Sequence, residues 1–168
     1  PGWTAYKFTE KAPVGGTFNT FKMSEGTAAP TLTGALKGLT MEIDGASIES
    51  GNPGRNATVA TQYFGKFAEK AQLKGAVVSA SGDAEKGTVV INLGMNGVSK
   101  DVEFTYAVSA EGALKAKATM EMMDFSLKAA FDSIHETCKA LHTGKDGIAK
   151  TWTDVALTVD AKVTKSCS

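Results

Sequence analysis

The chain has 168 residues, 42% of them apolar, which suits one folded domain with a sizeable core and excludes a disordered or fibrous protein. Eighteen acidic residues balance eighteen basic ones without a Lys/Arg cluster, which argues against binding to nucleic acid or to an anionic membrane surface. No apolar run has the length of a membrane span, and we expect a single domain over 1–168.

Strands are expected to dominate the first third of the chain. Trp3 to Thr9 and Thr17 to Met23 have the alternation of strands, with a turn at 12–16 between them. Residues 31–44 are predicted to form one long strand. Its apolar residues change phase near Gly38, which predicts a β-bulge there.

Two helices are expected to interrupt the strands. Asn56 is a suitable capping residue for a helix that runs to about Phe67. The second helix is predicted over Ser126 to Leu141, where apolar residues recur on one face at helical spacing.

Between the helices, four strands in a meander are predicted over 72–80, 87–96, 98–109 and 112–123, because apolar and polar residues alternate along them. An Asn-Gly pair at 96–97 joins the second strand to the third, and this pair is the strongest short-range signal of a hairpin.

A last strand is predicted over 151–165, which makes about eight strands in all. Since few helices are available to cover so many apolar strand faces, the sheet is expected to close on itself. We therefore predict an all-β fold, an eight-stranded antiparallel barrel with two helical insertions.

A barrel of eight strands is filled by its own side chains or holds one small ligand. The small residues Ala116, Ala118 and Ala161 have the inward phase and are compatible with an open lumen. No charge has the inward phase on the last three strands, so an open lumen would suit a long apolar molecule. A filled core fits the same alternation equally well.

Motifs of known enzyme classes are absent: there is no nucleophile elbow, phosphate loop, dinucleotide fingerprint or zinc-protease motif. We predict no catalytic residues, because the carboxylates fall on strand faces that should be wet. His135, Cys138 and His142 share one side of the second helix and are ligand types for zinc or copper. A single helix seldom supplies every ligand, so we expect no metal there.

The two cysteines, Cys138 and Cys167, are compatible with one disulfide and with two free thiols. A disulfide requires Cα atoms within about 7 Å. To meet this condition, the second helix would have to lie along the barrel wall, or the last strand would have to bend.

Several short motifs follow one another in a characteristic order. They are Val14-Gly15-Gly16-Thr17-Phe18, Ser47-Ile48-Glu49-Ser50-Gly51, Arg55-Asn56, Tyr63-Phe64 and the stretch 94–102, with 138–142 and 150–155 as a subgroup feature. Together they resemble the YceI-like, lipocalin-like polyisoprenoid-binding family over nearly the whole chain. Two departures concern the expected head-group region: Ser50 stands where Thr is common, and Asn56 stands where Asp is frequent.

The resemblance implies a lipocalin-like barrel that binds an isoprenoid lipid, such as a polyprenyl phosphate or a ubiquinone-type quinone, without catalysis and without a required cofactor. Family members are typically bacterial and periplasmic or secreted, and that location favours a disulfide between Cys138 and Cys167. The chain starts at Pro1 without Met, so we expect a processed form or a domain of a larger secreted protein.

The lipid tail is expected to contact inward residues of the strands: Phe18, Met41, Ile43, Ile91, Leu93, Phe104, Tyr106, Met120, Met122, Leu157 and Val159. Five further residues are expected to line or cap the mouths of the barrel: Phe64, Phe67, Phe131, Ile134 and Trp152. Arg55 is a candidate for the head-group contact, since its guanidinium suits phosphate or carbonyl oxygens. Alternatively, Arg55 hydrogen-bonds backbone carbonyls beside a turn.

Two other functions are compatible with the sequence. A carbohydrate-binding or adhesion module of a larger secreted protein would need an exposed row of aromatic side chains, whereas most of the aromatics here have the inward phase. An enzyme would need His135, His142 and Arg55 to assemble at the barrel mouth. Finally, the second helix offers an apolar face that the polar outer wall cannot match, so we expect this helix to cover a mouth.

Overall fold

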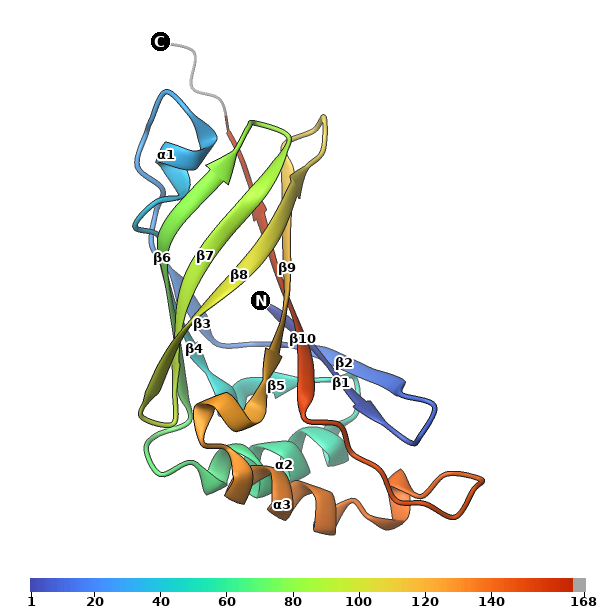
Figure 1. Ribbon diagram of the computed structural model, residues 1–168. Coiled ribbons are helices and arrows are strands. Elements are labelled where there is room, and N and C mark those ends of the chain that lie inside the picture. The colour runs from blue at the N-terminus through green and yellow to red at the C-terminus, as the bar shows by residue number, and fades with distance from the viewer. Residues whose placement is uncertain (165–168) are drawn as a thin grey trace.

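Ten antiparallel strands form one sheet that curls into a lipocalin-like barrel, as the computed structural model of residues 1–164 shows (Figure 1). The order of neighbours is β3-β4-β6-β7-β8-β9-β10-β1-β2-β5. The strands are β1 (Gly2–Lys7), β2 (Ala12–Phe18), β3 (Phe21–Met23), β4 (Thr40–Asp44), β5 (Ile48–Glu49), β6 (Gln72–Gly82), β7 (Lys86–Met95), β8 (Val98–Val108), β9 (Ala113–Glu121) and β10 (Asp154–Lys162).

The predicted number of strands, eight, becomes ten because two stretches of chain are each broken into two strands. β2 leads into β3 across Asn19 and Thr20, and β4 leads into β5 across the 3-10 turn Gly45–Ser47. These two stretches pair with each other as β2 with β5 and as β3 with β4. Both ends of the sheet therefore belong to the same two stretches, and this pairing closes the barrel.

The break at Gly45 makes room for an aromatic side chain. A Cβ atom at Gly45 would lie 2.5 Å from Cδ1 of Phe64, and the Gly45 amide hydrogen-bonds the Ala71 carbonyl at 2.7 Å. Asp44 caps the turn by accepting a hydrogen bond from the amide of Ala46 at 3.0 Å. A side chain larger than that of glycine at this position would collide with the Phe64 ring.

The predicted meander is confirmed as β6 to β9. Asn96 and Gly97, the turn between β7 and β8, have φ angles of +52° and +75°, which match the twist of a two-residue hairpin. The last strand is shorter than predicted, Asp154–Lys162 in place of 151–165.

At the N-terminus the predicted turn is misplaced. β1 ends at Lys7, and the turn lies at Phe8 and Lys11, whose φ angles are +62° and +59°. Residues 12–16, predicted as the turn, form most of β2, since Gly15 and Gly16 lie directly opposite β1. Positive φ angles at residues other than Gly and Asn give no sequence signal.

Residues 31–44 contain a helix that was predicted as a strand. α1 (Leu32–Leu36) begins at Thr31, whose side chain accepts a hydrogen bond from the Gly34 amide, and β4 begins only at Thr40. Gly38, with φ +82°, marks a change of element and not a bulge. Leu32 and Leu36 are one helical turn apart and pack on one end of the barrel core.

The two predicted helices are present with different limits. α2 (Pro53–Gln62) is capped by Asn52 and not by Asn56, because Pro53 takes the first helical position. α3 (Lys128–Thr137) follows a 3-10 helix, Met122–Phe125, and a second one, Ala140–His142, comes after it. In Figure 1, α2 and α3 lie side by side across the lower end of the barrel, as expected for the second helix.

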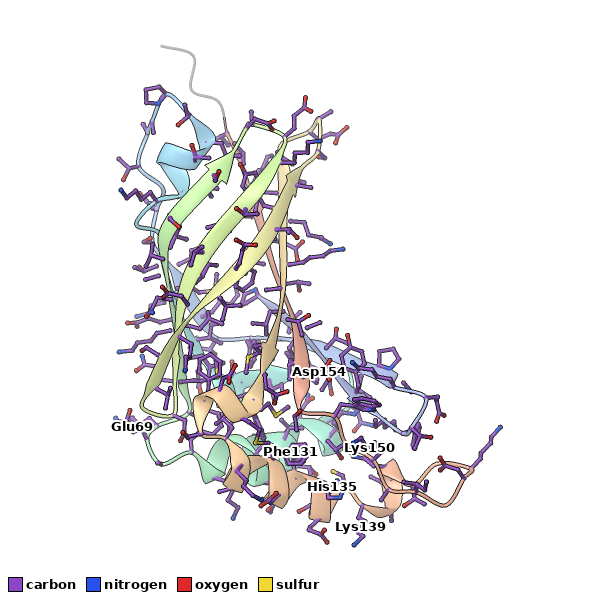
Figure 2. The ribbon with its side chains drawn as sticks, in the orientation of Figure 1. Glu69, Phe131, His135, Lys139, Lys150 and Asp154 are labelled. Carbon is purple, nitrogen blue, oxygen red and sulfur yellow. The ribbon has the colours of Figure 1, made fainter. Side chains whose placement is uncertain are left out.

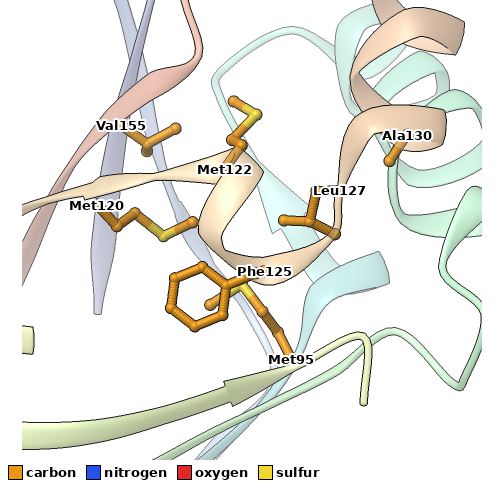
Figure 3. Close-up of a cluster of buried hydrophobic side chains, with 7 residues drawn as sticks. All are labelled: Met95, Met120, Met122, Phe125, Leu127, Ala130 and Val155. Atoms are coloured by element: carbon orange, nitrogen blue, oxygen red, sulfur yellow. The ribbon is translucent and has the colours of Figure 1, made fainter. Parts of the chain in front are cut away.

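The largest apolar cluster joins the lower end of the barrel to α3 (Figure 3). Phe125 and Leu127, each 1% exposed, come from the connection between β9 and α3 and pack beside Met120 and Met122. This cluster anchors the start of α3 to the barrel, while the opposite end of α3 lies further from it.

On β8 and β9, substitutions that introduce or change a charge should be tolerated only at positions that face outward from the barrel. Phe104 and Met120 are buried, whereas Glu103 and Lys117 are exposed. We expect Phe104→Asp and Met120→Asp to lower the free energy of unfolding by about 4 kcal/mol, since each removes buried apolar contact and buries a carboxylate.

The matched outer variants, Glu103→Lys and Lys117→Glu, should change it by less than about 0.5 kcal/mol. Chemical denaturation measures all four variants. Equal losses in the two pairs would contradict the inward and outward assignment.

Candidate ligand-binding cavity

The barrel encloses an elongated cavity of about 700 Å³. On β9 its lining extends from Leu114 to Met120, which corresponds to ~20 Å of strand at about 3.3 Å per residue. The cavity is therefore long and narrow, and its volume lies within the range of about 300–1,000 Å³ that is usual for small-molecule sites. The predicted open lumen is present, and the barrel is not filled by its own side chains.

Small residues on the inner phase of the strands leave this space open. Gly75, Ala116 and Ala161 line the cavity, and each occupies a position where a longer side chain would project into it. A Cβ atom at Gly75 would lie 3.3 Å from Cγ2 of Ile91. The wall between these positions consists mostly of aliphatic, aromatic and methionine side chains, which adapt to an apolar chain.

All but two of the residues predicted from the sequence to contact a lipid line this cavity. Those that line it are Phe18, Met41, Ile43, Arg55, Phe64, Phe67, Ile91, Leu93, Phe104, Tyr106, Met120, Met122, Ile134, Leu157 and Val159. Their position in the cavity is a structural finding, while their contact with a ligand stays a prediction.

Phe131 and Trp152 do not line the cavity. Phe131 packs against the lower apolar cluster and stacks on His135 with ring centroids 6.0 Å apart, as their positions in Figure 2 illustrate. Trp152 lies between the ammonium groups of Lys11 and Lys150, and its indole N–H donates to the Phe8 carbonyl at 2.8 Å. Both aromatics therefore fix the segments around the lower mouth.

At the upper end of the barrel, Tyr106 is fixed to the turn between β6 and β7. Tyr106 is 3% exposed, and its hydroxyl donates a hydrogen bond to the Asp83 carbonyl at 2.7 Å. Gly82 and Gly87 leave room for this ring, since a Cβ atom on either would lie within 3.0 Å of its hydroxyl oxygen. Burial and, secondarily, the Asp83 carboxylate raise the pKa of Tyr106. The hydroxyl thus serves the fold.

At the lower end, α2 and α3 meet through a hydrogen bond from the Ser133 hydroxyl to the Gln62 side chain at 3.1 Å. The helices run in opposite directions, and the cavity is lined by the first half of α2 and the last turn of α3. We call the opening between them the helical mouth. It is lined by Lys7, Asn52, Gly54, Arg55, Thr58, Thr137, Cys138, Leu141, His142 and Thr151.

A hydrogen-bond network places Arg55 at this mouth. The Asn56 side-chain oxygen accepts from the Ser50 amide at 2.9 Å and from the Ser50 hydroxyl at 2.7 Å, while its amide group donates to Glu49 at 3.1 Å. The hydrogen bond from Asn56 and then that from the Gly51 amide lower the pKa of Glu49. The contacts of Asn56 with Ser50 and Glu49 tie β5 to the first turn of α2. Arg55 is half-buried in the adjacent position.

The guanidinium of Arg55 makes no hydrogen bond or ion pair with any of residues 1–164. The alternative role for Arg55, a bond to backbone carbonyls beside a turn, is therefore not found within this range. The hydrogen bond that Arg55 does form uses its backbone amide, which donates to the Asn52 cap. Its side chain is available at the helical mouth.

Across the mouth, one threonine bridges the two histidines of the chain. The hydroxyl of Thr151 lies 2.9 Å from Nδ1 of His135 and 2.7 Å from Nδ1 of His142. A hydroxyl donates one hydrogen bond and accepts up to two, so at most one of two neutral rings accepts from Thr151 through Nδ1. In the ring whose Nδ1 accepts, Nε2 carries the proton.

The predicted sharing of one helical side by His135, Cys138 and His142 does not produce a metal centre in the described part of the chain, where no group of three candidate ligands converges. The Nδ1 atoms of the histidines face Thr151 instead. Burial raises the pKa of Cys138, against the opposing effect of Lys7. The predicted partner, Cys167, lies outside the described residues.

Sequence analysis missed Lys7 and Thr151 as residues of the mouth. Lys7 continues the inward phase of Trp3 and Ala5 on β1, and this alternation was a usable signal. Thr151 forms an isolated bridge with Lys7, which depends on the path of the chain after α3 and has no local signature. The pairing of α2 with α3 across the mouth has none either.

The helical mouth should perturb one histidine. The pKa of His142 is lowered first by burial and then by the positive charges of Lys7 and His135. We expect its imidazole to titrate below the ordinary value of about 6.5 in an NMR titration, and Lys7→Met to raise the midpoint. Lys100→Met, on the exposed outer wall, should leave the midpoint unchanged.

Because the folded state disfavours protonated His142, this group contributes stability above the unfolded pKa of about 6.5. That contribution is lost as the pH falls through the lower folded pKa. An unchanged midpoint in Lys7→Met would contradict the proximity of the two side chains.

Comparison with known proteins supports the fold. Residues 2–163 match the model of a protein family described as YceI-like domain. A crystal structure of Campylobacter jejuni YceI protein superposes with a TM-score of 0.68 at 19% identity, covering 95% of this chain and 90% of that chain.

Two further solved structures are similar. Burkholderia cenocepacia BcnA has a TM-score of 0.68 at 16% identity, with 97% of this chain and 96% of that chain covered. A polyisoprenoid-binding domain from Saccharophagus degradans, implicated in plant cell wall breakdown, has a TM-score of 0.60 at 17% identity, with 95% and 88% covered.

No curated protein matches the chain. Within residues 1–164, none of the helices is long and apolar enough to span a membrane. The family match extends over nearly the whole sequence. The chain belongs to the YceI-like domain family.

Proposed function

We propose that this protein binds a long apolar isoprenoid lipid in the barrel lumen, without catalysis. The observation that carries the proposal is the cavity itself, which is about 700 Å³ in volume, elongated and mostly apolar. An apolar cavity of this kind is poorly hydrated when empty, so an apolar chain replaces few favourable water contacts. The fold is shared with a polyisoprenoid-binding domain, which supports the same ligand class.

The shape of the cavity favours a linear chain over a compact ring system. The lining follows β9 for most of its length, and the polar groups lie mainly at the helical mouth. A molecule with one apolar tail and one polar head matches this division. Polyprenyl phosphates and ubiquinone-type quinones both have this form, and the protein would carry, store or sense one of them in a periplasmic or secreted location.

A carbohydrate-binding or adhesion module is less well supported. Binding of sugars on a flat face would require several exposed aromatic rings. Among the large apolar side chains that are exposed in residues 1–164, Phe21 is the only aromatic. The aromatic residues of the barrel contribute instead to the cavity and to the packing around its lower end.

The first test is the detection of a lipid with the purified protein. We expect native mass spectrometry to show a bound species, and organic extraction followed by mass spectrometry to identify a polyprenyl lipid or quinone. Added ligand at 100 times its dissociation constant should stabilise the protein by about 2.7 kcal/mol. For a domain of this size, that corresponds to a rise in Tm of about 5–10 °C.

A five-carbon prenyl alcohol serves as the control, because it occupies little of the cavity and should leave Tm almost unchanged. Bare protein after purification, together with no change in Tm on adding polyprenyl lipids or quinones, would contradict lipid binding.

The second test concerns release through the helical mouth. Ile134 lines the cavity from α3, while Phe131 on the same helix packs into the lower core. Ile134→Ala removes roughly 1 kcal/mol of packing from the cover of the cavity, so we expect lipid to dissociate about three to ten times faster.

Phe131→Ala should instead lower the free energy of unfolding by about 2–3 kcal/mol, since this ring is only partly buried. Stopped-flow transfer of lipid to acceptor vesicles gives the dissociation rate. A rate in Ile134→Ala equal to that of the wild type would place the exit elsewhere.

A further inference from the structure

The charged residues that line the cavity are all basic. Lys7, Arg55 and Lys74 contribute to the lining, and within residues 1–164 no aspartate or glutamate does so. The whole chain has equal numbers of acidic and basic residues, so composition does not explain this bias. Lys74 has the outward phase of β6 and is exposed, whereas Lys7 and Arg55 are half-buried at the helical mouth.

None of residues 1–164 forms an ion pair with either of the two cations at the mouth. The ion pairs within residues 1–164 join Lys11 to Asp154, Lys115 to Asp160, Lys128 to Asp132 and Lys139 to Glu136. The ammonium of Lys7 lies 4.6 Å from the centre of the Phe8 ring, and its partner is therefore a π system and not an anion. Partial burial of an unpaired charge is unfavourable, and a bound anion would relieve it.

The bridged histidines add hydrogen-bond capacity beside Lys7. Thr151 holds both imidazole Nδ1 atoms, and the backbone of Thr151 pairs with that of Lys7 as a β-bridge. His142 itself lines the cavity. This arrangement fixes the orientation of two rings, and their Nε2 atoms are left to interact with a ligand or with solvent. An anion with several oxygens is the ligand that ammonium, guanidinium and N–H donors bind most strongly together.

From this combination we infer that the helical mouth selects an anionic head group, a phosphate or a carboxylate on an apolar chain, over a neutral quinone. Lys7 and Arg55 supply the charge from β1 and α2, and the Nε2–H of His142, whose ring Thr151 orients, supplies a hydrogen bond. This inference rests on the proposed function. A quinone carbonyl accepts hydrogen bonds but leaves both cations without a counter-charge, so the mouth discriminates by charge and the lumen by shape.

The test compares three ligands that share a tail of four isoprene units and differ in the head, together with a fatty acid as a fourth probe. Geranylgeranyl phosphate, geranylgeraniol and a ubiquinone with a four-isoprene tail are titrated into delipidated protein, with palmitate as the carboxylate probe. We expect geranylgeranyl phosphate to bind at least ten times more tightly than geranylgeraniol and the quinone, with an advantage that decreases as salt increases. Palmitate binding more tightly than geranylgeranyl phosphate would support a carboxylate as the head group.

Two variants assign the effect to the mouth. Lys7→Met and Arg55→Met should each weaken binding of the phosphate about tenfold or more while changing binding of geranylgeraniol less than about threefold. Lys100→Met removes an equal charge from the exposed face of β8 and should change neither affinity. The melting temperature of each variant without ligand verifies that it folds.

Two results would overturn the inference. Equal affinities of the wild type for the phosphate and the alcohol would show that the mouth does not select charge, although lipid binding in the lumen would stand. Equal weakening of both ligands in Lys7→Met and Arg55→Met would show that these residues support the cavity and not the head group. If none of the four ligands binds, both the proposed function and the inference fail.

Discussion

The structure depends on the strict alternation of side chains along strands that close into a ring. Closure satisfies the edges of the sheet, but it also gives the inner side chains a fixed circumference to fill. In this chain several inner positions carry glycine or alanine, including Gly75, Ala116 and Ala161. The lumen therefore stays open, and its lining loses dispersion contacts that a ligand can restore. Fold stability and ligand binding consequently depend on the same inner residues.

Local sequence signals were sufficient for the middle of the barrel and insufficient for its ends. The strands from β6 to β9 were predictable because long alternation, an Asn-Gly turn and antiparallel pairing all agree. The prediction of one long strand over residues 31–44 was wrong, because Leu32 and Leu36 fit both an alternating strand and a helical turn. Packing against the barrel end decides between these two structures. The position of the first turn was also predicted wrongly. The positive φ angles of Phe8 and Lys11 are imposed by tertiary contacts and not by residue type.

The candidate site likewise has a part that the sequence predicts and a part that it does not. Inward phase alone located the wall of the cavity, since a side chain of that phase in a closed barrel has no other place to lie. The phase did not locate Trp152, which is held outside by Lys11, Lys150 and the Phe8 carbonyl. It also did not show that Lys7 and Arg55 line the same cavity, because Lys7 lies at the end of β1 and Arg55 on α2, far apart in the sequence. The positions of loops and helices relative to distant parts of the chain are the hardest to predict from a single sequence.

The two ends of the barrel differ in how they are held closed, and this difference gives the cavity a direction. At the upper end, Tyr106 is hydrogen-bonded to the turn that joins β6 to β7, so opening would break the meander itself. At the lower end, α2 and α3 are joined to each other by a side-chain hydrogen bond and by apolar contacts, and Leu141, in the 3-10 helix after α3, is 71% exposed. Elements with few buried contacts open at lower free energy than the strands of a core. The end of the barrel with the lower free energy of opening lies beside Lys7 and Arg55. A lipid that enters tail first through the helical mouth therefore ends with its head group at these basic residues.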